Sequence, residues 1–232
     1  MIDACPLLEA RDLGRREPNA ENWLLRDICI AIHASDRLAI VGPTGSGKTL
    51  LLRAMAQLDS VDAGEVLWQG KPISGDAVPR FRQQAIYLHQ RPALIEGTVE
   101  DNLRLPFSLR AHHQREFRSE EVSTLLARVN RDEAFLKRSS RNLSGGEAQI
   151  AALLRAIQLQ PTVLLLDEPT AALDVESTQL IEKLVTNWFD HSREERALVW
   201  VSHDKEQVCR VSDRIINMSN GQIADDEAGL SE

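Results

Sequence analysis

The sequence predicts an α/β protein with a parallel sheet and an inserted helical lobe. Apolar, strand-like runs alternate with segments in which apolar residues recur at helical spacing, an order typical of a parallel sheet covered by helices. Between about residues 98 and 141 no convincing strand pattern is visible, and the apolar positions keep helical spacing. We therefore expect one domain, with a core at 1–97 and 142–232 and a helical lobe at about 98–141.

The expected elements follow one another in a regular order. Before the lobe we expect strands at 7–13 and within 23–42, a helix at 46–58, a short hairpin at 64–73 and a strand at 84–90. After the lobe we expect a helix at about 147–159, a strand at 162–168, a helix at about 175–188, and strands at 197–204 and 213–218. The acidic end of the chain, from about residue 224, is expected to fray.

Composition narrows the class of protein. With 43% hydrophobic, 27% charged and 4% aromatic residues, the 232-residue chain has the composition of a soluble α/β protein. A net charge of −8 argues against a nucleic-acid partner, and no apolar run approaches the roughly 20 residues of a membrane span. Cys5, Cys29 and Cys209 lie far apart and predict free, mostly buried thiols. We expect the adjacent His112 and His113 to be solvated loop residues rather than metal ligands.

The first motif is GPTGSGKT, from Gly42 to Thr49. It fits the pattern G-x-x-x-x-G-K-[ST] and stands between the strand-like LAIV and an apolar helix, which is the context that a phosphate-binding loop requires. Gly45 and Gly47 let the backbone amides turn toward a phosphate. Lys48 is expected to neutralise the β- and γ-phosphates of a nucleotide, and Thr49 to bind Mg²⁺.

The second motif is VLLLDEPT. Its apolar run predicts a strand buried on both faces, and Asp167 and Glu168 follow at the carboxyl end, where ligands bind in open parallel sheets. Two adjacent carboxylates are costly there unless a cation is near. We expect Asp167 to hold Mg²⁺ through its water shell and Glu168 to act as the general base.

The third motif, LSGGEAQ, raises a question. Ser144 and Glu147 have the spacing of a capping box, yet the two glycines stand in the first helical turn, where each costs about 1 kcal/mol relative to alanine. A helix start without side chains would leave its amides open to an anion. The capping box does not explain why the chain accepts this cost at both positions.

Together with VSHD, these motifs resemble the ATP-binding cassette (ABC) family of ATPases in order and separation, over nearly the whole chain. The resemblance implies a P-loop NTPase core with a small antiparallel β subdomain. It also implies a head-to-tail pair of subunits, in which LSGGE of each copy closes over ATP held by the phosphate loop of the other. In that arrangement Gly145 and Gly146 are expected to expose their backbone amides to a γ-phosphate, which would explain the glycine pair. No nucleic acid is expected as a partner.

The resemblance assigns roles residue by residue. Gln90 matches the glutamine that reaches Mg²⁺ and the attacking water, although without the family it would be taken as a surface residue. His203 matches the histidine at the γ-phosphate. Asp174 matches a loop at the dimer interface, and it can equally cap the helix that begins at Val175.

The full set of implied site residues is as follows. The catalytic residues are Glu168, His203 and Gln90. The metal site comprises Thr49, Gln90 and Asp167. The ATP-binding residues are Gly42, Pro43, Thr44, Gly45, Ser46, Gly47, Lys48, Thr49, Ser144, Gly145, Gly146, Glu147 and Asp174.

Two positions depart from the family pattern. The family usually places an aromatic residue before the phosphate loop to stack on adenine, but that region here offers only Trp23, close to the core strand. We expect Arg16 or another group to take its place. Ile150 stands where many relatives have arginine, which predicts a changed local ion pair.

The resemblance also bears on the partner. One cassette without a membrane span looks like a separate ATPase subunit, peripheral on the cytoplasmic face of an inner membrane and paired with an integral membrane subunit. Thr98 is expected to cap a short helix with Val99 and Leu103 beside the docking groove. Several stretches, among them TVEDNL and LPFSLR, look most like the iron-export subgroup of FetA-like proteins. A soluble ATPase of a cytosolic assembly machine, such as iron–sulfur cluster biogenesis, remains the alternative.

Overall fold

The structure is a computed structural model that describes residues 5–112, 114–171 and 173–228. It divides into two compact units. The first draws on Met1–Tyr87, Thr162–Glu168 and Ser192–Glu232, and the second on Leu88–Pro161 and Pro169–His191. The second unit thus takes in the expected lobe at 98–141, the segment 88–97 before it and two helices after it.

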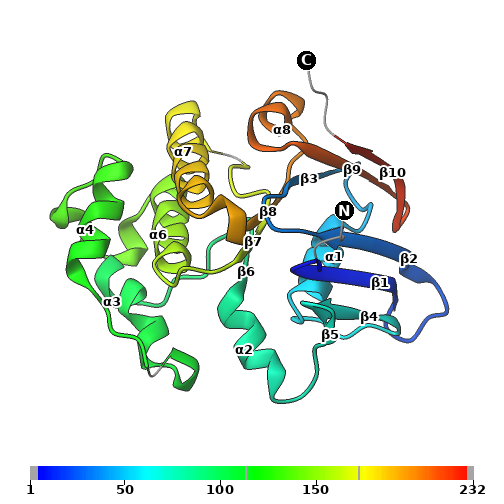
Figure 1. Cartoon of the computed structure of the whole chain (residues 1–232). Coiled ribbons are helices and arrows are strands. Elements are labelled where there is room, and N and C mark those ends of the chain that lie inside the picture. The colour runs from blue at the N-terminus through cyan, green and yellow to red at the C-terminus, as the bar shows by residue number, and fades with distance from the viewer. Residues whose placement is uncertain (1–4, 113, 172, 229–232) are drawn as a thin grey trace. The chain divides into compact units, whose positions relative to one another are not determined.

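A six-stranded sheet forms the centre of the first unit (Figure 1). Its order is β10-β9-β3-β8-β7-β6, with β3 parallel to β8 and β9 and β7 parallel to β8. The strands are β3 (Arg37–Val41), β6 (Ala85–Leu88), β7 (Val163–Asp167), β8 (Ala197–Val201), β9 (Arg214–Ser219) and β10 (Gln222–Ala228). Every residue of β7 and β8 is buried, as their continuous apolar runs predict.

A second, antiparallel sheet has the order β2-β1-β4-β5. Its strands are β1 (Leu8–Arg16), β2 (Trp23–Ile32), β4 (Ala63–Trp68) and β5 (Lys71–Pro72). The α1 helix (Lys48–Met55) contacts β1, β2 and β7, so that its apolar side chains share one core with both sheets. The predicted α/β class, with a parallel sheet and a small antiparallel subdomain, is confirmed.

A half-buried ion-pair cluster fixes the end of α1 to the antiparallel sheet. Asp59 accepts two hydrogen bonds from Arg53, with its oxygens 2.7 and 2.8 Å from the guanidinium nitrogens, and lies 2.6 Å from a guanidinium nitrogen of Arg15 on β1. The Arg53 hydrogen bond, helped by Arg15, lowers the pKa of Asp59 to about 2. This helix carries the phosphate loop at its start, so the cluster helps to hold that loop in place.

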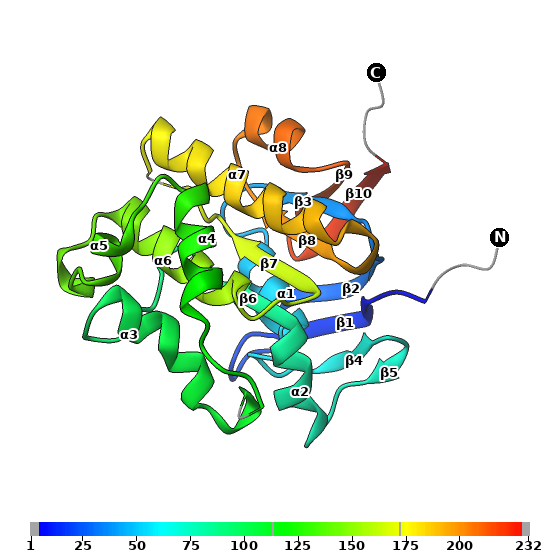
Figure 2. The same ribbon diagram turned by 60° about the vertical axis from the view of Figure 1, so that its left-hand side comes forward.

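The second unit is mainly helical (Figure 2). Its α-helices are α3 (Val99–Arg104), α4 (Ser119–Arg128), α5 (Glu133–Leu136), α6 (Gly145–Ile157) and α7 (Val175–His191), with short 3-10 turns at Leu105–Ser108, Arg110–His112 and Ser140–Asn142. The α6 helix contacts α3, α4 and α7, and nine of its 13 residues are buried. Thr98 caps α3 as expected, within a capping box with Asp101, although Val99 and Leu103 turn into the core.

Several local expectations were wrong. The acidic end does not fray at residue 224, because Gln222–Ala228 pairs with β9 as β10. The three cysteines are free but exposed rather than mostly buried. His112 is buried rather than solvated, and burial lowers its pKa; His113 lies outside the described residues. No helix in the described ranges is both long and apolar enough to cross a bilayer.

Candidate active site

The phosphate loop joins β3 to α1 in the first unit. Lys48, the first residue of α1, is buried and donates hydrogen bonds from Nζ to the carbonyl oxygens of Gly42 (2.8 Å) and Pro43 (3.0 Å). No carboxylate pairs with its ammonium group among the described residues. The charge of Lys48 is therefore held by backbone dipoles within the loop and is available to an anion.

Glycine is required at both ends of this loop, where a side chain would collide with a different sheet in each case. A Cβ on Gly42, at φ +149°, would lie 2.2 Å from the carbonyl oxygen of Met218 on β9. A Cβ on Gly47, at φ +101°, would lie 2.8 Å from Leu25 Cδ2 on β2. The loop is thus fixed against both sheets. The middle differs, since a Cβ on Gly45 would meet no atom within 4 Å; there it is the φ of +82° that favours glycine.

The two carboxylate oxygens of Asp167 each receive a hydroxyl. Thr49 Oγ1 lies 3.1 Å from Oδ1, and Tyr87 Oη lies 2.9 Å from Oδ2. Asp167 is buried at the end of β7 and forms no ion pair among the described residues. Burial, and then the charge and hydrogen bond of Asp167, raise the pKa of Tyr87, so the phenol keeps its proton. The sequence pattern did not single out Tyr87; its place three residues before Gln90, on a strand beside β7, was the available signal.

Glu168 follows Asp167 in a left-handed conformation, at φ +46°. Its backbone N–H donates to Val201 O (3.2 Å), and its carboxylate lies 3.9 Å from His203 Nδ1. The turn that carries His203 is held by Asp204, whose backbone N–H donates to Ser202 Oγ and whose carboxylate caps the α8 helix (Lys205–Val211). Non-glycine residues with positive φ are uncommon and concentrate at functional sites.

The region expected to hold adenine contains an arginine–tryptophan pair. Arg16 and Trp23 face each other across β1 and β2, with the guanidinium carbon 4.5 Å from the Trp23 ring centroid. Leu24 and Leu25, next along β2, adjoin Gly47. The pair thus lies close to the phosphate loop. That Arg16 contacts adenine, in place of the aromatic residue usual in the family, stays a prediction.

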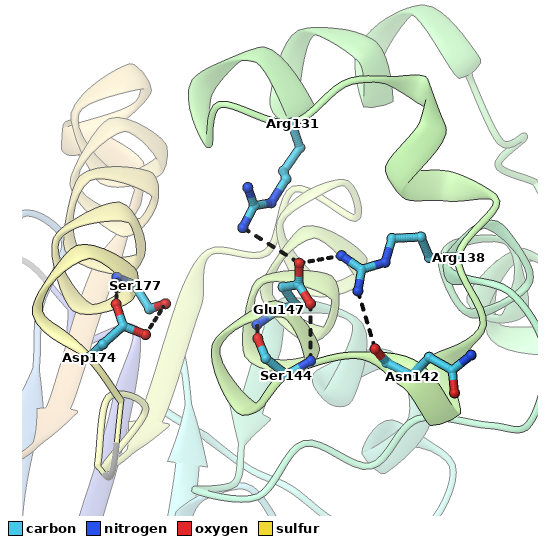
Figure 3. A network of polar contacts seen from close by, with 7 residues as sticks. All are labelled: Arg131, Arg138, Asn142, Ser144, Glu147, Asp174 and Ser177. Atoms are coloured by element: carbon cyan, nitrogen blue, oxygen red, sulfur yellow. Dashed lines mark hydrogen bonds and ion pairs between the residues drawn. The ribbon is translucent and has the colours of Figure 1, made fainter.

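The second unit contains the LSGGE motif at the start of α6 (Figure 3). Ser144 Oγ accepts the Glu147 N–H, and the Glu147 carboxylate accepts the Ser144 N–H, which completes the predicted capping box. Glu147 also pairs with Arg138 and lies 3.7 Å from Arg131. Burial opposes ionisation, but the Ser144 N–H and Arg138 outweigh it and lower the pKa of Glu147. Glu147 thus holds the motif in shape.

The two glycines of this motif differ. Gly145 is exposed, and a Cβ there would meet only Leu173 Cδ2, at 3.5 Å. Gly146 is buried, and a Cβ there would lie 2.4 Å from Ser177 Oγ and 2.8 Å from Ser177 Cβ. The missing side chain of Gly146 makes room for α7, whereas a phosphate at the amides of both glycines stays a prediction.

Asp174 and the remaining expected positions can now be placed. Asp174 accepts hydrogen bonds from the Ser177 backbone N–H and hydroxyl, both at 2.8 Å, which confirms the predicted cap at the start of α7. Ile150 is fully buried in α6, so an apolar contact replaces the expected ion pair. Gln90 is exposed in the second unit, after β6.

The donor set of the first unit fits a magnesium–nucleotide complex. Thr49 and Asp167 offer hard oxygen ligands, which Mg²⁺ prefers, beside a loop built to receive phosphates. The Ser46 hydroxyl is buried in this loop without a hydrogen-bond partner among the described residues. Such an orphaned group has a partner to gain from a bound ligand.

Comparison with known proteins identifies the family. The family model described as ABC transporter matches residues 25–171. The chain is 33% identical over 219 residues to the "Probable iron export ATP-binding protein FetA" of Escherichia coli (strain K12), covering 94% of this chain and 93% of that one. The chain belongs to the ABC transporter family. Within that family it is an ATP-binding ATPase subunit, and ATP is its nucleotide.

Two further relatives of this ABC ATPase extend the comparison. "Protein STAR1" of Oryza sativa subsp. japonica is 35% identical to this chain over 224 residues. The matched region covers 96% of this chain but only 63% of STAR1. The solved structure "Dimeric structure of a post-hydrolysis state of the ATP-binding cassette MJ0796 bound to ADP and Pi" matches with a TM-score of 0.83 and 25% identity, covering 97% of this chain and all of that one.

Proposed function

We propose that this ABC ATPase binds ATP as its magnesium complex, hydrolyses it between two copies of itself, and thereby drives a separate membrane subunit. The observation that carries the proposal is the cluster at the ends of β3, β7 and β8. There an unpaired Lys48 ammonium, the Thr49–Asp167 oxygens and the Glu168–His203 pair occupy one unit. These are the groups that phosphoryl transfer to water requires.

The phosphate loop binds the triphosphate. Its backbone amides and the N-terminus of α1 face the β- and γ-phosphates, and Lys48 exchanges the carbonyls of Gly42 and Pro43 for phosphate oxygens. Thr49 and Asp167 would hold the metal. When bound, Mg²⁺ neutralises charge on the phosphate oxygens.

Glu168 acts as the general base. It takes a proton from a water molecule whose oxygen attacks the γ-phosphorus, while the bond between that phosphorus and the oxygen of ADP breaks. His203, 3.9 Å from Glu168 and 73% exposed, contacts the γ-phosphate. The backbone N–H of Glu168 is anchored on Val201 O, which fixes the position of this residue at the end of β7.

The LSGGE helix of a second copy completes the site. Ser144 uses its lone pair within the capping box, so its hydroxyl proton remains for a phosphate oxygen. The exposed Gly145 lets that phosphate approach the amides at the start of α6. Because ATP bridges both copies, ATP binding favours the closed dimer. Hydrolysis of ATP then allows the two copies to separate.

The proposed membrane subunit and its metal cargo are supported by one of the relatives. FetA is named for iron export, and its similarity over nearly the full chain supports a role in metal export for this one. Cells that contain both this ATPase and its membrane subunit should then contain less iron than cells that lack them. Equal iron content, or recovery with soluble scaffold proteins and never with an integral membrane protein, would contradict this part of the proposal.

Two substitutions test the ATPase assignment. Glu168→Gln should retain ATP affinity and lose turnover by a factor of at least about 100, because the base is gone while the loop is intact. Lys48→Ala should weaken ATP binding instead. Fluorescent-nucleotide titration and phosphate release measure the two effects. Wild-type turnover in the first variant, or an unchanged dissociation constant in the second, would contradict the assigned roles.

A further inference from the structure

Tyr87 lies beside the proposed metal site, but none of the roles assigned above uses it. It is the only tyrosine of the chain, on β6, which neighbours β7 in the six-stranded sheet. Its hydroxyl lies 2.9 Å from Asp167 Oδ2, whereas Oδ1 faces Thr49. The metal-holding carboxylate is therefore clamped from both sides by two neutral hydroxyls.

The nature of this clamp suits a cation site. A buried carboxylate oxygen that lacks a hydrogen-bond donor is costly, and a donor removes that cost. A lysine or arginine would remove it too, but would repel a divalent cation bound next to the same carboxylate. The nearest guanidinium on α1, that of Arg53, is instead bound by both oxygens of Asp59.

We propose that Tyr87 is a positioning residue for the metal: its hydroxyl fixes the orientation of the Asp167 carboxylate, so that Oδ1 and the Thr49 oxygen face Mg²⁺ together. This inference rests on the proposed function. Outer-shell hydrogen bonds of this kind orient metal ligands and support their affinity for the ion. In addition, Tyr87 stands three residues before Gln90, so it anchors the strand from which that glutamine extends.

Tyr87→Phe is the direct test, because it removes one oxygen and keeps the ring. In a Glu168→Gln background, which prevents hydrolysis, Mn²⁺ binding to the ATP-loaded protein can be followed by electron paramagnetic resonance. We expect the Mn²⁺ dissociation constant to rise about tenfold, with ATP affinity in the absence of metal unchanged. Thr162→Val is the matched control. It removes a hydroxyl that lies 3.3 Å from Gln84 O, just before the same two strands, and should leave Mn²⁺ binding unchanged.

Because the chain has a single tyrosine, 3-fluorotyrosine labelling gives one ¹⁹F resonance from Tyr87. This resonance should shift when Mg²⁺ is added to the ATP-loaded protein, and not with ATP alone. Equal Mn²⁺ affinity in Tyr87→Phe and its parent, or a resonance unaffected by Mg²⁺, would overturn the inference while leaving the ATPase assignment standing. If the parent itself binds neither ATP nor Mn²⁺, the proposed function fails and this inference with it.

Discussion

The two adjacent glycines of the LSGGE motif have different surroundings. Gly146 packs against α7, whereas Gly145 leaves room for a phosphate from the partner copy. Gly146 lies against Ser177, whose side chain is bound to Asp174, so Ser177 has little freedom to move aside. Gly145 faces open space except for Leu173. The same substitution at adjacent positions should therefore have different consequences.

We predict that Gly146→Ala destabilises the protein by about 1–3 kcal/mol, through overpacking against α7. Gly145→Ala should leave stability unchanged or raise it by up to about 1 kcal/mol, since alanine favours the helix, yet it should prevent the ATP-dependent dimer. Urea unfolding and light scattering measure the two effects. Equal stability losses in both variants would show that the distinction between these glycines is wrong.

At the scale of elements, the position of α1 depends on the cluster of Asp59 with Arg53 and Arg15. Because the pKa of Asp59 in the folded state is about 2, below its usual value near 3.8, the ionised form is favoured by folding. Its stabilisation is fully present above about pH 4 and is lost as the pH falls toward 2. The size of the pKa shift corresponds to about 2 kcal/mol.

Asp59→Asn should accordingly lower the free energy of unfolding by about 2 kcal/mol at pH 7, and the difference from the parent should shrink between pH 4 and pH 2. Asp27→Asn is a suitable control, because the Arg26–Asp27 pair is more than 60% exposed on both sides and asparagine tolerates the positive φ of residue 27. Thermal unfolding across this pH range measures both. A pH-independent loss in Asp59→Asn would indicate that packing rather than charge is responsible.

The elements differ in how well the sequence predicts them. Those with a continuous apolar run or a cap signal, such as β7, β8 and the start of α6, could be predicted because burial or capping alone specifies them. The β10 strand was missed because its acidic residues carry no apolar alternation and are stabilised by pairing with β9 and by the Arg214–Asp226 ion pair. The Asn220–Gly221 turn, with both residues at positive φ, was the signal that could have revealed this hairpin. The α2 helix (Ala77–Gln84) and α8 were also missed, since helices of eight and seven residues are too short for a clear helical period. For α8 the Asp204 cap was an available signal.

The same distinction holds within the candidate site. Residues in contiguous motifs, such as Lys48 and Glu168, are visible in the sequence because their spacing along the chain is fixed. The Tyr87–Asp167 contact joins positions 80 residues apart, and no local pattern marks it. Nor could spacing reveal that Gly146 serves packing, because that requires the position of Ser177.

At the scale of the whole molecule, the account depends on ATP joining two copies through Ser144 and the phosphate loop. The most direct test compares the mass of Glu168→Gln with that of Glu168→Gln/Ser144→Arg, each in saturating magnesium–ATP. We predict that the first forms a dimer and that the second binds ATP with the same affinity yet stays a monomer, because arginine at the start of α6 blocks the partner's phosphate. If the ATP-saturated Glu168→Gln variant stays monomeric at every concentration, or if both variants dimerise equally, the central claim is contradicted.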